Sequence, residues 1–273
     1  MTALLISLSM GAAVGLVLAL SGAGGGILAV PLLVFGLHLS MVQAAPVGLI
    51  AVGLASALGA VLALREGKVR YRAAVIIGVT GMAFAPLGVM LAHRLPNAPL
   101  MVGFSLVLAW VAVRSIRQSL APVPAGPSAP STLQVCRLDP VRGQLRLVSP
   151  CVLALGVTGA LSGLLSGLLG VGGGFVIVPM LGAFSNVPIR GIVATSLAVI
   201  ALVSVGGVAG AASQGAVAWD VALPFAAGAV LALLAGRRLG ARLAGARLQQ
   251  AFGATAGVVA VLVLLRGLGV LAL

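Results

Sequence analysis

Apolar residues occupy the chain in eight long runs, which are separated by short polar or basic segments. A helix needs about 20 apolar residues to cross the hydrocarbon core of a membrane, and six of the runs have roughly that length. These six cover approximately residues 42–64, 71–92, 98–118, 189–213, 217–236 and 248–270. The other two runs, at 3–37 and 149–185, are too long for a single straight crossing. The pattern predicts an all-α integral membrane protein.

The two longest runs are each interrupted near the middle by glycines. The interruptions consist of Gly22, Gly24, Gly25 and Gly26 in the first run and of Gly170, Gly172, Gly173 and Gly174 in the second. A glycine destabilises a helix by about 1 kcal/mol relative to alanine, so three adjacent glycines should end one. A short apolar run with a proline follows each interruption, at Pro31 and Pro179. We therefore expect a broken helix in each run, with a short second helix that starts just after Gly26 or Gly174.

The two halves of the chain match each other at a constant offset of 148 residues. The glycines and the proline of the first interruption fall on those of the second, and the register persists downstream, where Arg94 matches Arg242 and Phe104 matches Phe252. A segment with five prolines, several serines and most of the mid-chain charge lies between the halves. The pattern predicts a first membrane repeat at 1–119, a Pro-rich cytoplasmic linker at 120–148 and a second membrane repeat at 149–273.

The composition supports a membrane protein and excludes most soluble classes. Hydrophobic residues make up 61% and charged residues 7% of the 273 residues, whereas a soluble domain has about 25% charged residues. Lys and Arg number 16 and Asp and Glu 3, which gives a net charge of +13. The cations stand in short clusters between apolar runs, a pattern that orients a membrane protein on anionic lipid. We therefore expect contact with membrane lipid and none with nucleic acid.

The basic clusters also favour one membrane topology over another. They lie at Arg65–Arg72, Arg137–Arg146 and Arg237–Arg247. If each half crossed the membrane four times, the third cluster would lie outside. If each glycine-broken segment instead re-enters and returns to its starting side, each half crosses three times and the second half is inverted. All three clusters then face the cytoplasm, as the positive-inside rule requires, and both termini face outward. We therefore expect two inverted repeats, each a re-entrant glycine-broken helix plus three transmembrane helices.

The glycine interruptions are the candidate binding site. The start of a helix presents unpaired N–H groups and the positive end of the helix dipole, which bind anions without a charged side chain. Two such starts facing each other would form an anion cradle, as at the midplane of transporters with broken helices. We assign it to Gly24, Gly25, Gly26, Gly172, Gly173 and Gly174, together with Ser21, which could bind the anion or cap a helix. The scattered glycines, such as Gly11, Gly15, Gly159 and Gly163, are better explained by helix packing.

The glycine motifs resemble those of the sulfite exporter TauE/SafE family of membrane permeases. The resemblance rests on the segments from Gly22 to Pro31 and from Gly170 to Pro179, and on Ala194-Thr195-Ser196-Leu197. It implies transport of sulfur-containing oxyanions, such as sulfite, organosulfonates or thiosulfate, across a bacterial inner membrane. Thr195 and Ser196 would donate hydrogen bonds to such an anion, unless their hydroxyls bond to their own helix. The first half departs from the pattern, because Val47 and Gly48 stand at the matching positions.

The remaining residues favour transport of an anion over other activities. The three acidic residues, Glu66, Asp139 and Asp220, all stand near the ends of expected spans or in loops, whereas a cation permease should carry carboxylates at membrane depth. We expect no catalytic residues, no metal site, no cofactor and no ATP-binding loop. The two cysteines, Cys136 and Cys151, are not spaced as metal ligands, and we expect neither a redox nor a metal site there. The sequence therefore predicts a multi-pass secondary transporter that works by alternating access. The alternatives are a channel or carrier for other small organic anions, and a non-transporting membrane scaffold or assembly factor.

Overall fold

The computed structural model describes residues 2–120, 136, 148–243 and 246–269, and within them the side chains at 4–20, 25–117, 119–120, 136, 148–236 and 250–269. Most of the predicted linker at 120–148 lies outside the described residues. The described elements are α1 (Thr2–Ser21), the 3₁₀ helix η1 (Gly22–Leu28), α2 (Ala29–Gly36), α3 (Met41–Arg65), α4 (Tyr71–Arg94), α5 (Asn97–Leu120), α6 (Ser149–Leu169), α7 (Gly174–Phe184), α8 (Ile189–Ser213), α9 (Trp219–Leu243) and α10 (Ala246–Gly267).

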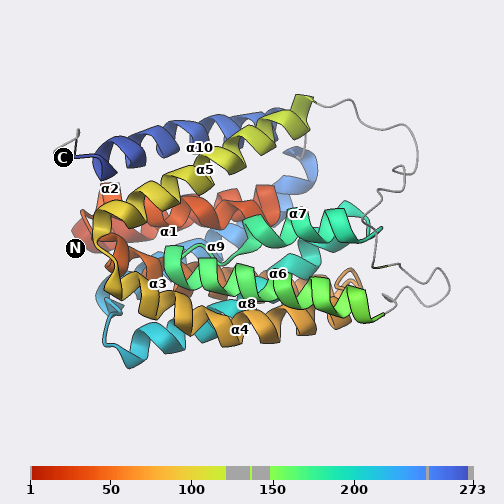
Figure 1. The fold of residues 1–273 in the computed structure, drawn as a ribbon. Helices are drawn as coiled ribbons and strands as arrows, with labels where there is room; N and C mark the ends of the chain where they lie inside the picture. Colours follow the sequence, from red (N-terminus) through yellow and green to blue (C-terminus); the bar gives the residue numbers. More distant parts are fainter. Residues whose placement is uncertain (1, 121–135, 137–147, 244–245, 270–273) are drawn as a thin grey trace.

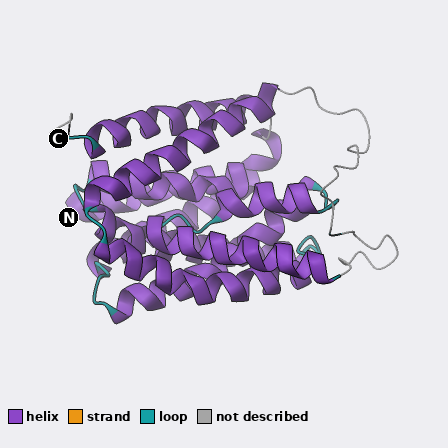
Figure 2. Ribbon diagram, viewed as in Figure 1, coloured by secondary structure: helices purple, strands orange, loops and turns teal. Residues whose placement is uncertain are grey.

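Over the described ranges the fold is all-helical, which confirms the predicted class (Figures 1 and 2). Seven of these helices are long and apolar enough to cross a membrane, namely α3, α4, α5, α6, α8, α9 and α10. The six runs predicted to cross once are among them, and α6 is the seventh. Figure 1 shows the elements as a bundle of roughly parallel and antiparallel helices, with both termini marked at one end and with α5 ending and α6 beginning at the other.

The boundaries of the helices repeat along the chain with the same offset as the sequence. Helix α3 begins at Met41 and α8 at Ile189, and they end at Arg65 and Ser213, so both boundaries lie 148 positions apart. A glycine with positive φ follows each of these helices, Gly67 with a φ of 67° and Gly215 with a φ of 64°. Glycine adopts this left-handed conformation without a steric penalty. The matched glycines therefore end matched helices.

Both glycine-broken segments double back on themselves. After the first break the chain runs antiparallel to α1, because a Cβ on Gly25 would overlap the backbone of Leu18 and a Cβ on Gly36 would overlap the side chain of Met10. Helix α7 likewise returns along α6, since a Cβ on Gly173 would overlap Ser162. Each segment therefore forms a hairpin, and α6 within the second hairpin has the length of a full membrane span.

Each doubled segment packs on a helix from the other half of the chain. Helix α1 packs on α9, and α6 packs on α4. Glycines make both contacts possible, because a Cβ on Gly15 would overlap the backbone of Ala229 and a Cβ on Gly163 would overlap the backbone of Gly81. Small residues of this kind let membrane helices approach closely. The scattered glycines thus have the packing role expected of them, and the two predicted repeats interlock, with α3 against α8 between them.

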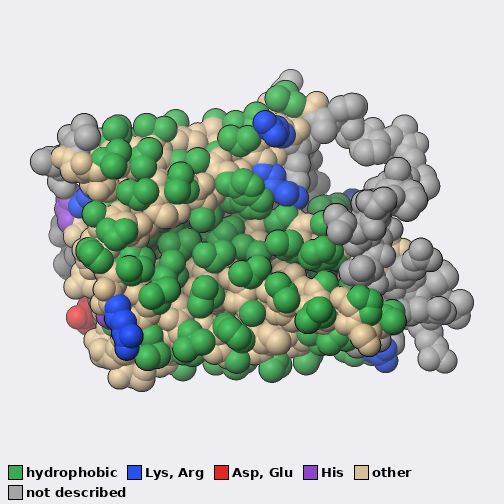
Figure 3. All heavy atoms as spheres, in the orientation of Figure 1, with side chains coloured by type: hydrophobic (Ala, Val, Ile, Leu, Met, Phe, Trp, Pro, Cys, Tyr) green, Lys and Arg blue, Asp and Glu red, His purple; other side chains and the backbone are tan. Residues whose placement is uncertain are grey.

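The surface between the two ends of the bundle is apolar. Large hydrophobic side chains are exposed along most of the long helices, for example Leu54, Val79, Leu106 and Leu231. Figure 3 shows hydrophobic side chains over much of the visible face, with Lys, Arg and acidic side chains toward its two ends. In water such a surface would be an aggregation hazard, but it matches the hydrocarbon of a bilayer.

A disulfide lies at the end of the bundle where α6 begins. Cys136 and Cys151 are joined, and both are fully buried. The Cys136 N–H also donates to the Phe184 carbonyl oxygen at 2.9 Å, so this bridge joins the start of α6 to the end of α7. The spacing of these cysteines predicted neither a redox nor a metal site, and the disulfide shows that the redox part of this prediction was wrong. Disulfides persist mainly in oxidising compartments, whereas the basic residues of the 66–72 loop favour the cytoplasm for this end.

A cysteine added after Leu273 tests which end of the bundle faces the cytoplasm. We expect it to react with a membrane-impermeant thiol reagent in intact cells, because the positive-inside rule places the basic end in the cytoplasm and the termini outside. The parent protein is the control, since its two cysteines are joined and leave no free thiol. Labelling only after lysis would reverse the orientation and put the disulfide on the oxidising side.

Candidate functional site

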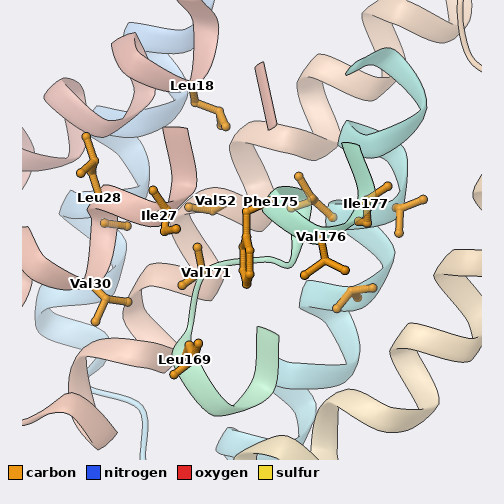
Figure 4. Close-up of a cluster of buried hydrophobic side chains, with 14 of the residues drawn as sticks. Leu18, Ile27, Leu28, Val30, Val52, Leu169, Val171, Phe175, Val176 and Ile177 are labelled. Atoms are coloured by element: carbon orange, nitrogen blue, oxygen red, sulfur yellow. The ribbon is translucent and has the colours of Figure 1, made fainter. Parts of the chain in front are cut away.

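The two glycine breaks meet each other near the middle of the bundle. A Cβ on Gly26 would lie 3.0 Å from the Val171 carbonyl oxygen and 2.9 Å from Cγ1 of Val52, and a Cβ on Gly172 would lie 3.2 Å from the same Cγ1. Figure 4 shows Ile27, Val52, Val171 and Phe175 gathered between the breaks. Val52 belongs to α3, so this helix lies against both breaks at once. The structure therefore brings together the two segments that the sequence predicts as one site.

The second break has the geometry of an anion-binding helix start. Gly170, Gly172 and Gly173 have φ angles of 73°, 78° and 72°, which glycine tolerates far better than other residues. Helix α7 starts at Gly174 with Gly173 as its N-cap, and no side chain in the described part of the chain caps it. In the first turn the Val176 N–H donates to the Gly173 carbonyl oxygen at 3.0 Å, and the N–H groups of Gly174 and Phe175 have no partner within the helix. They point, together with the positive end of the helix dipole, toward the meeting point of the breaks.

The first break differs from the expected one. Residues Gly22–Leu28 form a 3₁₀ helix, and α2 begins at Ala29 rather than just after Gly26. None of the glycines from Gly22 to Gly26 has a positive φ, in contrast to three glycines of the second break. The chain therefore keeps a helical conformation through the first glycine cluster, and fewer N–H groups are left for a ligand because each 3₁₀ turn pairs an N–H with a carbonyl. The cradle is asymmetric.

Apolar side chains close the space between the breaks. Ile27, Val52 and Val171 are at most 2% exposed and Phe175 is 7% exposed, and they fill the region that Figure 4 draws. Gly25, Gly26, Gly172, Gly173 and Gly174 are buried. Ser21 ends α1 and Gly24 lies in η1, but the burial of these two residues is outside the described part of the structure. Apolar side chains thus cover the breaks, an arrangement called the closed state below.

Thr195 and Ser196 both use their hydroxyls for local hydrogen bonds. The Thr195 O–H donates to the Gly191 carbonyl oxygen at 2.6 Å, and its oxygen accepts from the Arg70 N–H at 3.0 Å. Arg70 is the N-cap residue of α4, so Thr195 ties the start of α4 to α8. The Ser196 O–H donates to the Val193 carbonyl oxygen at 2.8 Å. A hydroxyl has one proton to donate, and in this closed state both donors are occupied.

The Thr195 contact predicts a change in stability rather than in substrate affinity. We expect Thr195→Val to lower the free energy of unfolding by about 1 kcal/mol, because the Arg70 N–H loses its acceptor, and to leave the KM for transport unchanged. Thermal unfolding and flux measurements check both parts. Thr255→Val is the matched control, since the Thr255 hydroxyl bonds only to its own helix, at Ala251. A raised KM with unchanged stability would instead place Thr195 in the binding site.

Several buried serines near the breaks were missed by the sequence reasoning. The Ser162 O–H donates to the Gly173 carbonyl oxygen at 3.2 Å, and therefore fixes the N-cap of α7. Ser56, Ser166 and Ser204 are buried with no hydrogen-bond partner in the described part of the chain. Ser56 and Ser204 stand 148 positions apart. The repeat offset could have singled them out, because few polar residues within the expected spans match across it.

Two further features lie at the end of the bundle that carries the termini. A surface cleft of about 380 Å³ has His93 and Arg94 at the end of α4 on one side, and Ser213 and Gln214 at the end of α8 on the other. Arg266 of α10 donates to the Val34 carbonyl oxygen at 3.2 Å, and so neutralises the negative end of the α2 dipole. In the described part of the chain, no group of three or more metal-ligating side chains is present.

Comparison with known proteins gives one family and several relatives. A family model described as "Sulfite exporter TauE/SafE" matches residues 7–263. A protein named "Probable membrane transporter protein" from Xylella fastidiosa strain Temecula1 is 27% identical over 270 residues, which cover 96% of this chain and 95% of the relative. A "Probable membrane transporter protein" from Methanocaldococcus jannaschii is 27% identical over 204 residues, which cover 72% and 68%. No solved structure matches the chain.

The helices and these matches define a multi-pass membrane transporter, and not an enzyme. The chain belongs to the sulfite exporter TauE/SafE family, whose model covers nearly its whole length. The resemblance carried by the two glycine motifs is therefore confirmed.

Proposed function

We propose that the protein is a secondary transporter of sulfur-containing oxyanions, which are sulfite, organosulfonates or thiosulfate, in a bacterial inner membrane. The family description supports the substrate class, and the names of the relatives support transport. The contact between the two breaks carries the proposal, because it places the start of α7 and the first glycine cluster at one central point. A helix start in a water-excluded place stabilises an anion more than it does in water.

The distribution of charge supports an anionic substrate. Of the three acidic residues, Glu66 pairs with Lys68 in an exposed loop at 2.6 Å, Asp220 is exposed at the start of α9, and Asp139 lies outside the described residues. The interior of the described spans therefore offers a cation no carboxylate. Arg94 and His93 line a cleft at the end of the bundle, where they would draw anions toward the protein. A proton relay through a buried carboxylate is correspondingly disfavoured.

Alternating access would use the two predicted repeats, 1–119 and 149–273, as its moving units. Figure 1 shows α1 starting at the end with the termini and its counterpart α6 starting at the opposite end, which supports an inverted relation. In the proposed cycle, Ile27, Val52, Val171 and Phe175 separate toward one side and then the other, and expose the glycines in turn. Thr195 and Ser196 would contact the anion only in a conformation in which their hydroxyls leave their own helix.

Flux into proteoliposomes tests the proposal. Purified protein is reconstituted, and uptake of labelled sulfite is measured with a membrane potential and a pH gradient imposed separately. We expect saturable uptake that thiosulfate or an organosulfonate competes with. Flux that does not saturate would indicate a channel, and uptake of other organic anions alone would change the substrate class. Folded protein without flux for any of these anions would favour the membrane scaffold or assembly factor.

A further inference from the structure

Two serine hydroxyls are buried without partners where α3 crosses α8. Ser56 is fully buried and Ser204 is 3% exposed, and within the described part of the chain neither side-chain oxygen has a hydrogen-bond partner. They occupy matching positions of the two halves, 148 residues apart. Each lies close to the middle of a 25-residue helix, so both would sit deep in the hydrocarbon layer of a membrane.

Ser204 packs against α3 about one turn from Ser56, and each serine is about one turn from a residue that contacts the glycine breaks. A Cβ on Gly53 would lie 3.0 Å from the Ser204 hydroxyl oxygen, and Ser56 is three residues beyond Gly53, about 4.5 Å along the helix axis. Helix α8 also touches the break, because a Cβ on Gly172 would lie 2.8 Å from Cγ2 of Ile200. Residues four apart share a helix face. Each serine is therefore one turn from a residue, Val52 or Ile200, that contacts the break.

Most other buried hydroxyls in the described part of the chain differ from these two. Ser105, Thr158, Ser185, Thr195 and Ser196 each donate to a carbonyl oxygen of their own helix. Such a bond satisfies the hydroxyl at little cost in a membrane helix. A buried hydroxyl without a partner is unfavourable. Ser166 shares this condition, but its matching position in the first half is Leu18, so among the three only Ser56 and Ser204 form a matched pair.

We propose that Ser56 and Ser204 are substrate-binding residues of the translocation path, and that their hydroxyls donate hydrogen bonds to two oxygens of an oxyanion held at the start of α7. This inference rests on the proposed transport function. The two serines supply hydrogen-bond donors from α3 and α8, whereas the hydroxyls of Thr195 and Ser196 already donate to carbonyl oxygens of their own helix. In the closed state Val52 and Ile200 separate the hydroxyls from the break, and parting of the breaks brings the anion between them.

Transport kinetics of single alanine variants test the pair. We expect Ser56→Ala and Ser204→Ala each to raise the KM for the transported anion about tenfold, the effect of losing one charge-assisted hydrogen bond. We expect the melting temperature to stay the same or rise, because an unpartnered hydroxyl is removed. Ser105→Ala is the matched control, since Ser105 is equally buried but its hydroxyl bonds to Val102. An unchanged KM in both variants, with saturable flux in the parent, would contradict the binding role of the two serines without contradicting the transport function.

Thiol labelling tests the pair without reference to flux. Ser56→Cys and Ser204→Cys place a single free thiol in a protein whose native cysteines are joined. In sulfite-free buffer, we expect both variants to react with a small anionic thiosulfonate reagent. We expect added thiosulfate to slow the reaction. Ser105→Cys should stay unlabelled. If neither Ser56→Cys nor Ser204→Cys reacts in folded protein, the pair does not line an aqueous path and the inference fails, whatever the flux assay shows.

Discussion

Replacement of Gly173 by leucine is expected to abolish transport while the protein still inserts into the membrane. Gly173 has a φ of 72°, a conformation that costs a residue with a Cβ roughly 1–2 kcal/mol. Its added Cβ would also overlap the Ser162 hydroxyl, and the rest of the side chain would occupy the start of α7. Gly25→Leu should have the same effect at the first break, because its Cβ would overlap the backbone of Leu18.

Flux in proteoliposomes and membrane insertion in cells together measure this prediction. Gly67→Leu is the matched control, because Gly67 has a φ of 67° but no atom within 4 Å of an added Cβ. It carries the backbone strain of Gly173 without the collision, and we expect it to keep most of its flux. Flux at the parent level in both Gly25→Leu and Gly173→Leu would remove the glycine breaks from the proposed site.

The second large effect is expected from Gly163→Leu, which should prevent α6 from packing on α4. The added Cβ would overlap the Gly81 carbonyl group, and the collision is with backbone, which cannot rotate away. Overpacking of a close contact costs about 1–3 kcal/mol, and a leucine here should lie at or above the upper end. We expect a large fall in melting temperature and in the yield of folded protein.

Gly156→Leu is the control for this effect, because Gly156 lies on the same helix with no atom within 4 Å of an added Cβ. It should be neutral or slightly stabilising, since leucine favours a helix over glycine. Gly15→Leu, at the matching position against Ala229 of α9, should fail as Gly163→Leu does. If Gly163→Leu unfolds at the parent temperature, the close approach of α4 and α6 is wrong.

Local physical chemistry made the elements of this protein predictable from sequence. The lengths of the apolar runs reflect the thickness of the hydrocarbon layer, and seven described helices meet that length. Glycine clusters end helices because of backbone entropy, and an α-helix ends just before each predicted cluster, at Ser21 and at Leu169. The 148-residue offset carries over to the boundaries of α3 and α8. Each span and each break depends on residues close together in the chain, and the offset repeats the same local pattern in the second half.

The first break shows where local reasoning reached its limit. Gly22 to Gly26 look equivalent to the second glycine cluster in sequence, yet they form a 3₁₀ helix rather than a left-handed turn. Glycine permits several backbone conformations at similar cost, so the surrounding packing chooses among them. Here Gly25 lies against Leu18 and Gly26 against Val171 and Val52. Composition alone could not distinguish the two outcomes.

Sequence patterns were sufficient to predict an all-helical membrane protein with two broken helices and two halves that match at a constant offset, because hydropathy, helix propensity and spacing are local quantities. The helix faces that pack against each other are known from the tertiary structure alone. It paired α1 with α9 and α6 with α4 across the halves. It also brought the Thr195 hydroxyl to the N–H of Arg70, 125 positions away, and packed Ser204 of α8 against Gly53 of α3, one turn from Ser56. These contacts depend on the close packing of helices that are distant in sequence, which no local pattern specifies.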